Sequence, residues 1–581
     1  MATPAAGWRT WVPGLELARS YRLAWLRGDL VAGIVLTAML VPAGMAYAEL
    51  AGLPAVTGLY ATIVPLVVYA VFGPSRILVL GPDSAVSPLV AATIIPLAAA
   101  PDERIALAGM LAILVGAVFV AGGIAKLGFI TDLLSKPIRL GYLAGIALTV
   151  IMTQLPKLFG FSGGGDTFRE AVPAFFGHLD ETHGITLALG IACLAVIMLL
   201  KRFAPVVPGV FVAMAGAMIV TAAANLEEHG VEVVGSLPQG LPSLDFPSVA
   251  AGDFPKLLLG AVGIAFVAFA DTSVLSRSYA SRLGQNVDQS QELIALGAAN
   301  AATGLFQGFP LSSSSSRTPV AEAAGAKTQL TGLVGAGCLA LVLLFATGLF
   351  ASLPQAALAA VVIAAVIGLI DIAGVRRLYK MSPQELVVFT ASFAGVLLAG
   401  VLWGIGIAVA LAILAFLRRA WWPHEAVLGR VDGVKGYHDN TRYPDARLVP
   451  GLLLFRFDAP LFFANANVFR QHLLERIAES DPPVRWVVLA AEPMTDVDPS
   501  AAEVLEDLND DLRDAGIKLA FAELKDPVRD RLRRYGLVER FGRDAFFPTI
   551  GSAVHAYVDA TGVEWVDWED VDEAGVSRSR S

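Results

Sequence analysis

Cysteine and charged residues are both scarce in this chain. Only two of its 581 residues are cysteine, which excludes a small secreted domain held together by disulfides. Charged residues make up 16% of the chain and hydrophobic residues 56%. An average soluble protein has roughly 25% charged residues, and a globule of this size needs more polar surface. The composition therefore indicates a protein that lies largely in a membrane.

An excess of positive charge is also missing. The chain has 42 Lys and Arg against 51 Asp and Glu, which argues against a dedicated nucleic-acid binder. Residues 1–429 hold 23 basic and 23 acidic residues, whereas residues 430–581 hold 19 and 28. The long apolar runs also stop at Leu417. The sequence thus predicts a membrane domain followed by an acidic soluble domain, which has the usual size of one domain.

The apolar runs predict the number of membrane crossings. A helix needs roughly 17–25 apolar residues to cross the hydrocarbon. Seven such runs precede a polar gap: 30–48, 50–75, 84–100, 105–125, 140–156, 184–200 and 203–226. The runs after the gap are 254–270, 293–309, a segment from Leu311, and two double-length runs, 328–370 and 386–417. We therefore expect 14 spans, seven in each half.

Basic residues favour one side of the membrane. Eighteen Lys and Arg fall in segments on the side of the N-terminus and four on the other side, which is the bias of cytoplasmic loops. An even number of spans then places both termini in the cytoplasm. The first apolar run is long enough to remain as a span, so we expect no separate signal peptide. These features predict a multi-pass protein of a bacterial-type inner or plasma membrane.

The third apolar element is broken in both halves. Gly81-Pro82 interrupts the first, and Gly308-Phe309-Pro310 interrupts the second; small hydroxylated residues follow each break. An odd number of spans in the first half makes the second half enter the membrane inverted. Transporters built from inverted repeats place their site near the midplane, where two broken helices meet. The sequence therefore predicts a substrate site between the two breaks.

The residues after the breaks favour an anion. The start of a half-helix presents unpaired N–H groups and a partial positive charge, and two such ends form an anion site. The hydroxyls of Ser84, Ser87, Ser314 and Ser316 are additional donors. An alternative for each serine is a role as a helix cap.

Three charged residues in or beside the predicted spans are functional candidates. Arg317 is the one basic residue not assigned to a loop, and a guanidinium in the bilayer is a functional candidate. Its alternative is a structural ion pair with Glu322 or Asp271. Asp271 must be protonated, paired or bound to a cation, which predicts coupling to H⁺ or Na⁺. Asp83 is either the N-cap of the short helix or an acid of the site.

Several short motifs point to one family. They are residues 41–48 (VPAGMAYA), 52–54 (GLP), 58–60 (GLY), 308–310 (GFP), the Ser-x-Ser-Arg at 314–317 and 325–330 (GAKTQL). These motifs resemble the SulP (sulfate permease) family of anion transporters, over nearly the whole chain. The resemblance implies a core domain of spans 1–4 and 8–11 that moves as an elevator against a gate domain of spans 5–7 and 12–14.

The resemblance also implies a set of site residues. Asp271 corresponds to the family's acidic position in span 8. Ala43 stands where the family often has Gln, and Asp83 stands where neutral residues are commoner. The implied substrate pocket consists of Asp83, Ser84, Ala85, Val86, Ser314, Ser316 and Arg317.

From Gly451 the pattern changes to alternating strands and helices. The predicted strands are 452–457, 486–491 and 518–522, and the predicted helices are 466–477, 501–515 and 527–535. This alternation predicts a small sheet covered by helices. The region resembles the family's STAS domain, and it has no phosphate-binding loop, metal cluster or nucleophile–base pair. Ser500 resembles the serine phosphorylated in related bacterial domains; its alternative is that Asp498 or Ser500 only caps the following helix.

The sequence analysis thus predicts an all-α polytopic membrane domain of 7+7 inverted repeats with a cytoplasmic α/β STAS domain. The expected function is secondary transport of a small inorganic anion, sulfate first and bicarbonate second, without enzymatic activity, metal or cofactor. Alternatives are a channel or exchanger for chloride or dicarboxylates, and a nucleobase symporter. The resemblance implies a homodimer, and we expect a cytoplasmic protein partner for the STAS domain. The predicted boundaries are 1–28, 29–419 (repeats 29–226 and 253–419), 430–560 and an acidic flexible tail, 561–581.

Overall fold

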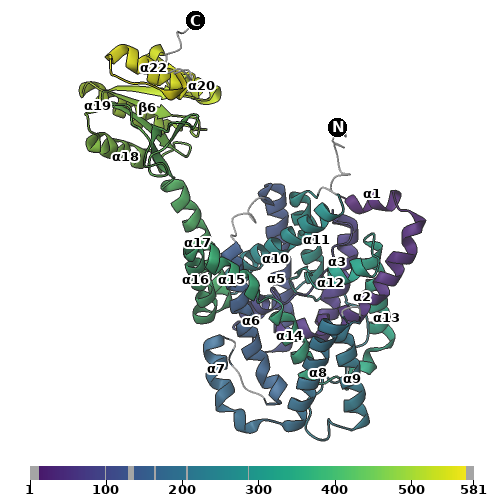
Figure 1. Ribbon diagram of the computed structural model, residues 1–581. Helices are drawn as coiled ribbons and strands as arrows, with labels where there is room; N and C mark the ends of the chain where they lie inside the picture. Colours follow the sequence, from purple (N-terminus) through teal and green to yellow (C-terminus); the bar gives the residue numbers. More distant parts are fainter. Residues whose placement is uncertain are drawn as a thin grey trace. The chain divides into compact units, whose positions relative to one another are not determined.

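The computed structural model describes residues 12–98, 100–128, 136–161, 165, 167–204, 207–284 and 287–570 (Figure 1). The chain divides into two compact units, Met1–Ala412 and Ile413–Ser581. Helices dominate the first unit, in which two short strands form the only described sheet, and the second unit contains a six-stranded sheet.

The helices of the first unit occur in the same order in both halves of the sequence. The first half contains α1 (Pro13–Arg19), α2 (Leu23–Leu50), α3 (Ala55–Phe72), β1 (Leu80–Gly81), α4 (Ser87–Ile94), α5 (Pro101–Ile124), α6 (Lys136–Phe159), α7 (Phe168–Gly177), α8 (Gly184–Phe203) and α9 (Gly209–Ala223). The second half contains α10 (Phe254–Arg282), α11 (Gln289–Leu305), β2 (Ser312–Ser313), α12 (Arg317–Ala323), α13 (Leu330–Phe345), α14 (Gln355–Ile367), α15 (Ile372–Met381), α16 (Pro383–Ala399) and α17 (Val401–Trp421), which continues into the second unit. Within the described residues, seven helices are long and apolar enough to cross a membrane.

The two halves pack against each other reciprocally. Helix α2 packs against α13, and α10, the corresponding helix of the second half, packs against α5. In the same way α12 packs against α2 and α4 against α10, while α6 contacts α16 and α14 contacts α8. This exchange of equivalent contacts is the relation expected of two structural repeats.

Helices α2 and α3 approach very closely because small residues meet at their interface. A methyl group added at Gly58 would lie 1.9 Å from the carbonyl oxygen of Gly44. Small residues at such contacts let helix backbones pack tightly in a membrane. Helix α3 in turn packs against β1, so this pair of helices supports the first break.

A buried carboxylate joins the start of α2 to the loop before α13. Asp29 is fully buried, and its Oδ1 accepts hydrogen bonds from the backbone N–H groups of Lys327 (2.7 Å) and Thr328 (3.0 Å). The hydroxyls of Thr328 and Thr331 donate to Asp29 at 2.7 and 3.0 Å. Part of the motif at 325–330 therefore has a structural role, because it satisfies a carboxylate that would be costly to bury alone.

The second unit is an α/β domain with one mixed sheet. Its strands lie in the order β4-β3-β5-β6-β7-β8, and β5 to β8 run parallel to one another while β3 is antiparallel to both of its neighbours. The strands are β3 (Glu425–Arg430), β4 (Tyr437–Asp439), β5 (Leu452–Phe457), β6 (Trp486–Ala490), β7 (Lys518–Ala522) and β8 (Phe546–Phe547). The helices are α18 (Ala466–Glu479), α19 (Pro499–Asp514), α20 (Asp526–Arg534), α21 (Leu537–Phe541) and α22 (Ile550–Thr561). Side chains of α18 to α21 cover one face of the sheet and those of α22 the other.

The segment after α22 differs from the sequence prediction. A solvated, mobile tail was expected past Gly562, but Val563 and Trp565 pack against the sheet. The buried Arg430 pairs through Nη2 with Asp567 at 2.7 Å and Glu569 at 2.5 Å. Burial by itself lowers the pKa of Arg430, but the two carboxylates more than offset this and raise it above its usual value. The prediction is therefore wrong for residues 563–569, because their acids neutralise a buried cation; residues 571–581 lie outside the described part.

Candidate functional site

The two broken elements lie side by side and form a small sheet inside the first unit. Strand β1 pairs antiparallel with β2, with Leu80 opposite Ser313 and Gly81 opposite Ser312. The backbone N–H of Ser314 donates to the carbonyl oxygen of Val79 at 2.9 Å and extends the pairing. Because each strand belongs to a different half of the sequence, this pairing brings together the residues that follow both breaks.

Backbone and side-chain features fix the two breaks. Gly81 adopts a φ of +152°, and Pro82 follows it without an N–H to donate. On the other side, the Asn300 side chain holds Leu311 by two bonds: Oδ1 accepts from the Leu311 N–H at 3.0 Å, and Nδ2 donates to its carbonyl at 3.3 Å. The Thr318 hydroxyl accepts a bond from the Val79 N–H at 3.1 Å. The short helices α4 and α12 therefore start from backbone whose position is well defined.

Arg317 lies between the two breaks and is 1% exposed. Its Nη2 donates a hydrogen bond to the carbonyl oxygen of Pro82. Within the described part of the chain, Nε and Nη1 are buried and have no hydrogen-bond partner. The structure also gives no ion pair between Arg317 and Glu322 there, since the recorded partner of Glu322 is Arg282 at 3.4 Å. Arg317 thus presents a buried guanidinium with unused donors, as expected of a ligand-binding group.

The serines after the second break surround the same region. The Ser314 hydroxyl accepts a bond from the Arg317 N–H at 3.2 Å and lies 3.2 Å from the Ser316 hydroxyl. Ser314 is fully buried, whereas Ser316 is exposed. Ser316 is the N-cap residue of α12, but among the described contacts its side chain makes no capping bond. Ser314 therefore supports the start of α12, and the Ser316 hydroxyl is accessible from solvent.

The residues after the first break are nearly all inaccessible. Ser84, Ala85 and Val86 are 6%, 1% and 0% exposed, backbone included. Asp83 is 8% exposed, and its Oδ2 accepts a bond from the Ala85 N–H at 3.1 Å. Helix α4 begins only at Ser87, with Val86 as its N-cap. The interpretation of Asp83 as the N-cap is therefore wrong: its side chain closes a turn before the helix.

Acidic groups accompany the guanidinium. Asp83 interacts electrostatically with Arg317 and also with Asp271 of α10. Asp271 is partly exposed as a residue. Tyr47, in the first-span motif, is 5% exposed and lies within electrostatic range of Asp83 and Arg317. Asp271 also interacts electrostatically with Arg139 of α6, so two cations and two acids share this region of the protein.

Sequence reasoning missed three polar residues. Asn300 and Thr318 bind the backbone at the two breaks, and Glu292 is buried on α11. Asn300 and Thr318, which fix the breaks, have ordinary side chains within apolar runs, so only the tertiary contacts identify them. Glu292 is fully buried on α11, where its carboxylate accepts bonds from the Tyr69 hydroxyl (2.6 Å) and the Ser276 hydroxyl (2.8 Å). The apolar run 293–309 starts one residue after Glu292, so the run itself does not include this acid.

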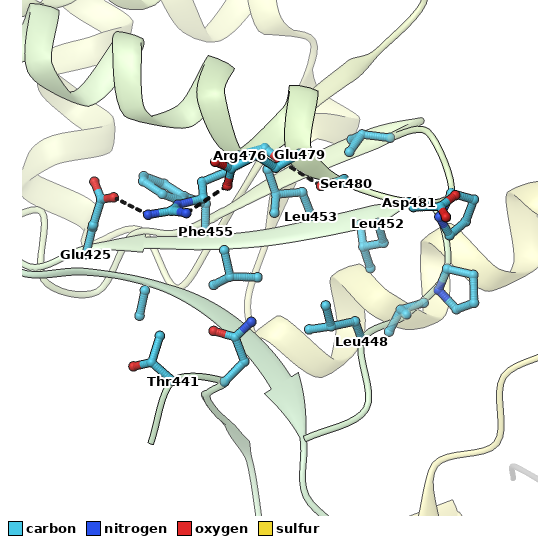
Figure 2. A pocket seen from close by; sticks show the side chains of 18 residues that line it. Glu425, Thr441, Leu448, Leu452, Leu453, Phe455, Arg476, Glu479, Ser480 and Asp481 are labelled. Atoms are coloured by element: carbon cyan, nitrogen blue, oxygen red, sulfur yellow. Dashed lines mark hydrogen bonds and ion pairs between the residues drawn. The ribbon is translucent and has the colours of Figure 1, made fainter. Parts of the chain in front are cut away.

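The second unit contains a separate cavity of about 560 Å³ between β3, β5 and the end of α18. Figure 2 shows its lining, in which Arg476 bridges Glu479 at 2.8 Å and Glu425 at 3.5 Å. Leu448 and Leu452 contribute apolar side chains. The cation of this cavity is already paired with carboxylates, so the cavity lacks the unpaired buried donor that Arg317 provides.

Ser500 lies in the first turn of α19 and is exposed. The helix is capped by Asp498, whose Oδ1 accepts from the Ala501 N–H at 2.8 Å, while Oδ2 accepts from the Phe463 N–H at 2.9 Å. The capping role considered for this loop is therefore filled by Asp498. Ser500 is exposed, and its regulatory role stays a prediction.

The fold and the paired breaks define a multi-pass membrane protein of the repeat-built transporter class. Residues 26–392 match the sequence profile of the Sulfate permease family, and residues 443–553 match that of the STAS domain. The chain belongs to the sulfate permease family, whose members are transporters and not enzymes. The predicted fold class, a helical membrane domain with a C-terminal STAS domain, is confirmed.

Two relatives support the family assignment, and two solved structures support the fold. A probable sulfate transporter of Mycobacterium tuberculosis is 43% identical over 548 residues, which cover 94% of this chain and 98% of the relative. A probable sulfate transporter of Arabidopsis thaliana is 32% identical and matches 93% and 82% of the two chains. The murine Solute Carrier 26 family member A9 anion transporter, in the inward-facing state, superposes with a TM-score of 0.89 at 23% identity over 97% and 96% of the chains. The transmembrane domain of a cyanobacterial bicarbonate transporter matches 68% of this chain and 98% of its own, with a TM-score of 0.59 at 23% identity.

Proposed function

We propose that this protein is a secondary transporter of a small inorganic anion that binds between the two broken elements. The observation that carries the proposal is the buried Arg317 guanidinium with two unpaired nitrogen atoms. Sulfate is the first candidate, since the relatives in Mycobacterium and Arabidopsis are named sulfate transporters, and bicarbonate is the second. The ligand site comprises Asp83, Ser84, Ala85, Val86, Ser314, Ser316 and Arg317.

The proposed chemistry uses one full positive charge and neutral donors. Arg317 gives charge-assisted hydrogen bonds, which are roughly twice as strong as neutral ones. The exposed Ser316 hydroxyl adds a donor, and the start of the eight-residue helix α4 adds a partial positive charge. A neutral nucleobase gains little from an unpaired guanidinium, so this arrangement favours an anion over the nucleobase alternative.

We also propose that the membrane domain works as an elevator. The core consists of α2–α5 with α10–α13, and the gate of α6–α9 with α14–α17. Most helix contacts join elements within one of these groups, such as α5 with α11 and α6 with α16, while α14 contacts both α6 and α2. Movement of the core would carry the whole anion site, because both breaks and Arg317 belong to the core.

Asp271 is the proposed coupling residue, for H⁺ or Na⁺. It is partly exposed and interacts electrostatically with Asp83, so binding of a cation there would offset the negative charge that arrives with the anion. The alternatives are a channel or an exchanger for chloride or dicarboxylates. Coupling to a driving ion separates the transporter from the channel. A channel passes an anion down that anion's own gradient, without a fixed ratio to a driving ion.

Uptake into proteoliposomes tests the function directly. Labelled sulfate, bicarbonate, chloride and a dicarboxylate are each offered with and without an inward pH or Na⁺ gradient. The proposal requires accumulation of sulfate or bicarbonate above its equilibrium level when one gradient is imposed. Passive equilibration of all anions under every condition would support the channel instead.

The arrangement in the membrane and the assembly are further parts of the proposal. The proposed fourteen spans lie in two repeats, 29–226 and 253–419, and are followed by the STAS domain at 430–560. This even number of spans puts both termini in the cytoplasm of a bacterial-type cell with an inner membrane. A reporter fused after Ser581 that is active only outside the cytoplasm would contradict this topology. The STAS domain is proposed to support a homodimer and to bind a cytoplasmic protein, with Ser500 as its modification site.

A further inference from the structure

Helix α15 is a short helix at the end of the apolar stretch Gln355–Met381 and is too short to cross a bilayer by itself. Its ten residues, Ile372–Met381, span about 15 Å, half of the roughly 30 Å hydrocarbon thickness. It follows the apolar helix α14 after a turn and leads directly into α16 at Pro383. Figure 1 shows α15 close to α16 and α6, and it packs against both. Helix α15 therefore lies between the C-terminal end of α14 and the N-terminal end of α16, two apolar helices of the gate.

The exposed surface of α15 combines bulky apolar and basic side chains. Ile372, Tyr379 and Met381 are 57%, 69% and 76% exposed. Arg376, Arg377 and Lys380 are exposed as well. Asp371 is the N-cap of α15, where its side chain accepts a bond from the Gly374 N–H at 2.7 Å, and the next acid along the chain is Glu385 in the first turn of α16.

More basic residues belong to the neighbouring helix ends. Helix α6, which packs against α15, starts with the exposed Lys136. The Nζ of Lys201, at the end of α8, lies 3.8 Å from the position of a methyl group added at Gly368, in the turn before α15. Within the described residues, Arg376, Arg377 and Lys380 have no ion pair or hydrogen bond through their side chains. We call Lys136, Lys201, Arg376, Arg377 and Lys380 the basic rim.

We propose that α15 lies in the headgroup layer and that the basic rim binds anionic phospholipids. Amphipathic helices with Lys and Arg beside large apolar residues lie in the membrane interface, with the apolar side chains in the acyl region. Clusters of four to eight basic residues next to a membrane helix bind anionic headgroups. Both features are present here, and among the described residues no ion pair joins an acid to Arg376, Arg377 or Lys380. The occupant is a lipid, because the apolar residues of α15 lie within the same exposed surface as its charges.

Lipid titration of the detergent-solubilised full chain tests the proposal. The probes are short-chain phosphatidylglycerol, phosphatidylcholine with the same chains, and glycerol phosphate, which carries the charge without the chains. Isothermal titration calorimetry should show tightest binding for phosphatidylglycerol. One basic residue near an anionic surface strengthens binding about fivefold. Replacing Arg376, Arg377 and Lys380 by Gln should therefore weaken phosphatidylglycerol binding by up to about a hundredfold and remove its advantage over phosphatidylcholine.

A matched control removes the same charge elsewhere. Arg442, Arg485 and Lys525 are exposed on the STAS domain, and their replacement by Gln should leave lipid binding unchanged. The double variant Ile372→Ser and Met381→Ser should weaken the binding of phosphatidylglycerol and of phosphatidylcholine to a similar extent. Binding of glycerol phosphate should persist. Each variant must elute as a single species of wild-type size.

Two results would overturn the proposal. One is equal binding of phosphatidylglycerol by the wild type and the triple Gln variant. The other is tighter binding of an acidic polyglutamate peptide than of phosphatidylglycerol to the wild type, which would assign the basic rim to a soluble acidic partner. Neither result depends on which anion the protein transports.

Discussion

Replacing Arg317 by Ala removes the only full positive charge described between the two breaks. The guanidinium has two unpaired nitrogen atoms, Nε and Nη1, while Nη2 is occupied by the Pro82 carbonyl. One charge-assisted hydrogen bond contributes roughly 1.5–3 kcal/mol. Since 1.4 kcal/mol corresponds to about a factor of ten, the loss of one bond weakens anion binding about ten- to hundredfold, and the loss of two weakens it further.

Arg317→Lys should restore only part of the affinity. A lysine ammonium keeps the charge but does not reproduce the planar fork that holds Pro82 with one nitrogen and a ligand with the others. The assay is sulfate binding to purified, detergent-solubilised protein, measured by calorimetry. Size-exclusion elution and thermal unfolding show whether each variant is folded, which is essential because Arg317 is buried.

A second change displaces the guanidinium without removing it. A methyl group at Gly81 would lie 2.9 Å from Arg317 Nη1, and the φ of +152° disfavours any side chain there. Gly81→Ala should therefore lower sulfate affinity even though Arg317 is present. Gly337→Ala on α13 is the matched control, because nothing lies within 4 Å of its added methyl group. Wild-type affinity in folded Arg317→Ala and Gly81→Ala proteins would refute the proposed site.

Three more predictions follow from other parts of the structure. Asp271→Asn should abolish gradient-driven accumulation yet leave anion exchange measurable in proteoliposomes; an unchanged dependence on pH and Na⁺ would remove Asp271 from the coupling mechanism. Deletion of the chain after Gly429 should reduce expression or transport rate but keep the order of substrate preference, because the proposed pocket lies in the membrane domain; a changed order in folded protein would contradict this. Arg430→Met should expose residues 563–569 to hydrogen exchange, since breaking a buried ion pair costs about 3–5 kcal/mol; protection equal to that of the wild type would show that Arg430 does not hold this segment.

The sequence predicted the membrane domain well because the bilayer imposes strong rules on it. Apolar runs of sufficient length and two matched breaks were readable without any structure. The strands and helices of the STAS domain from Leu452 to Arg534 were also predicted to within a few residues, because β-α alternation is a local pattern. The strands β3, β4 and β8 were not predicted, since each is short or lies outside the regular alternation.

Tertiary structure decided which polar groups meet. The pairing of β1 with β2 joins residues more than 230 positions apart, and no local pattern indicates that Arg317 reaches Pro82. Asn300 and Thr318 fix the breaks through contacts that only the folded chain creates. The same holds for Arg430, which turns an acidic stretch that looks solvated into an ordered segment. Composition and periodicity report how a residue relates to solvent, but the partner of a buried polar group depends on the whole fold.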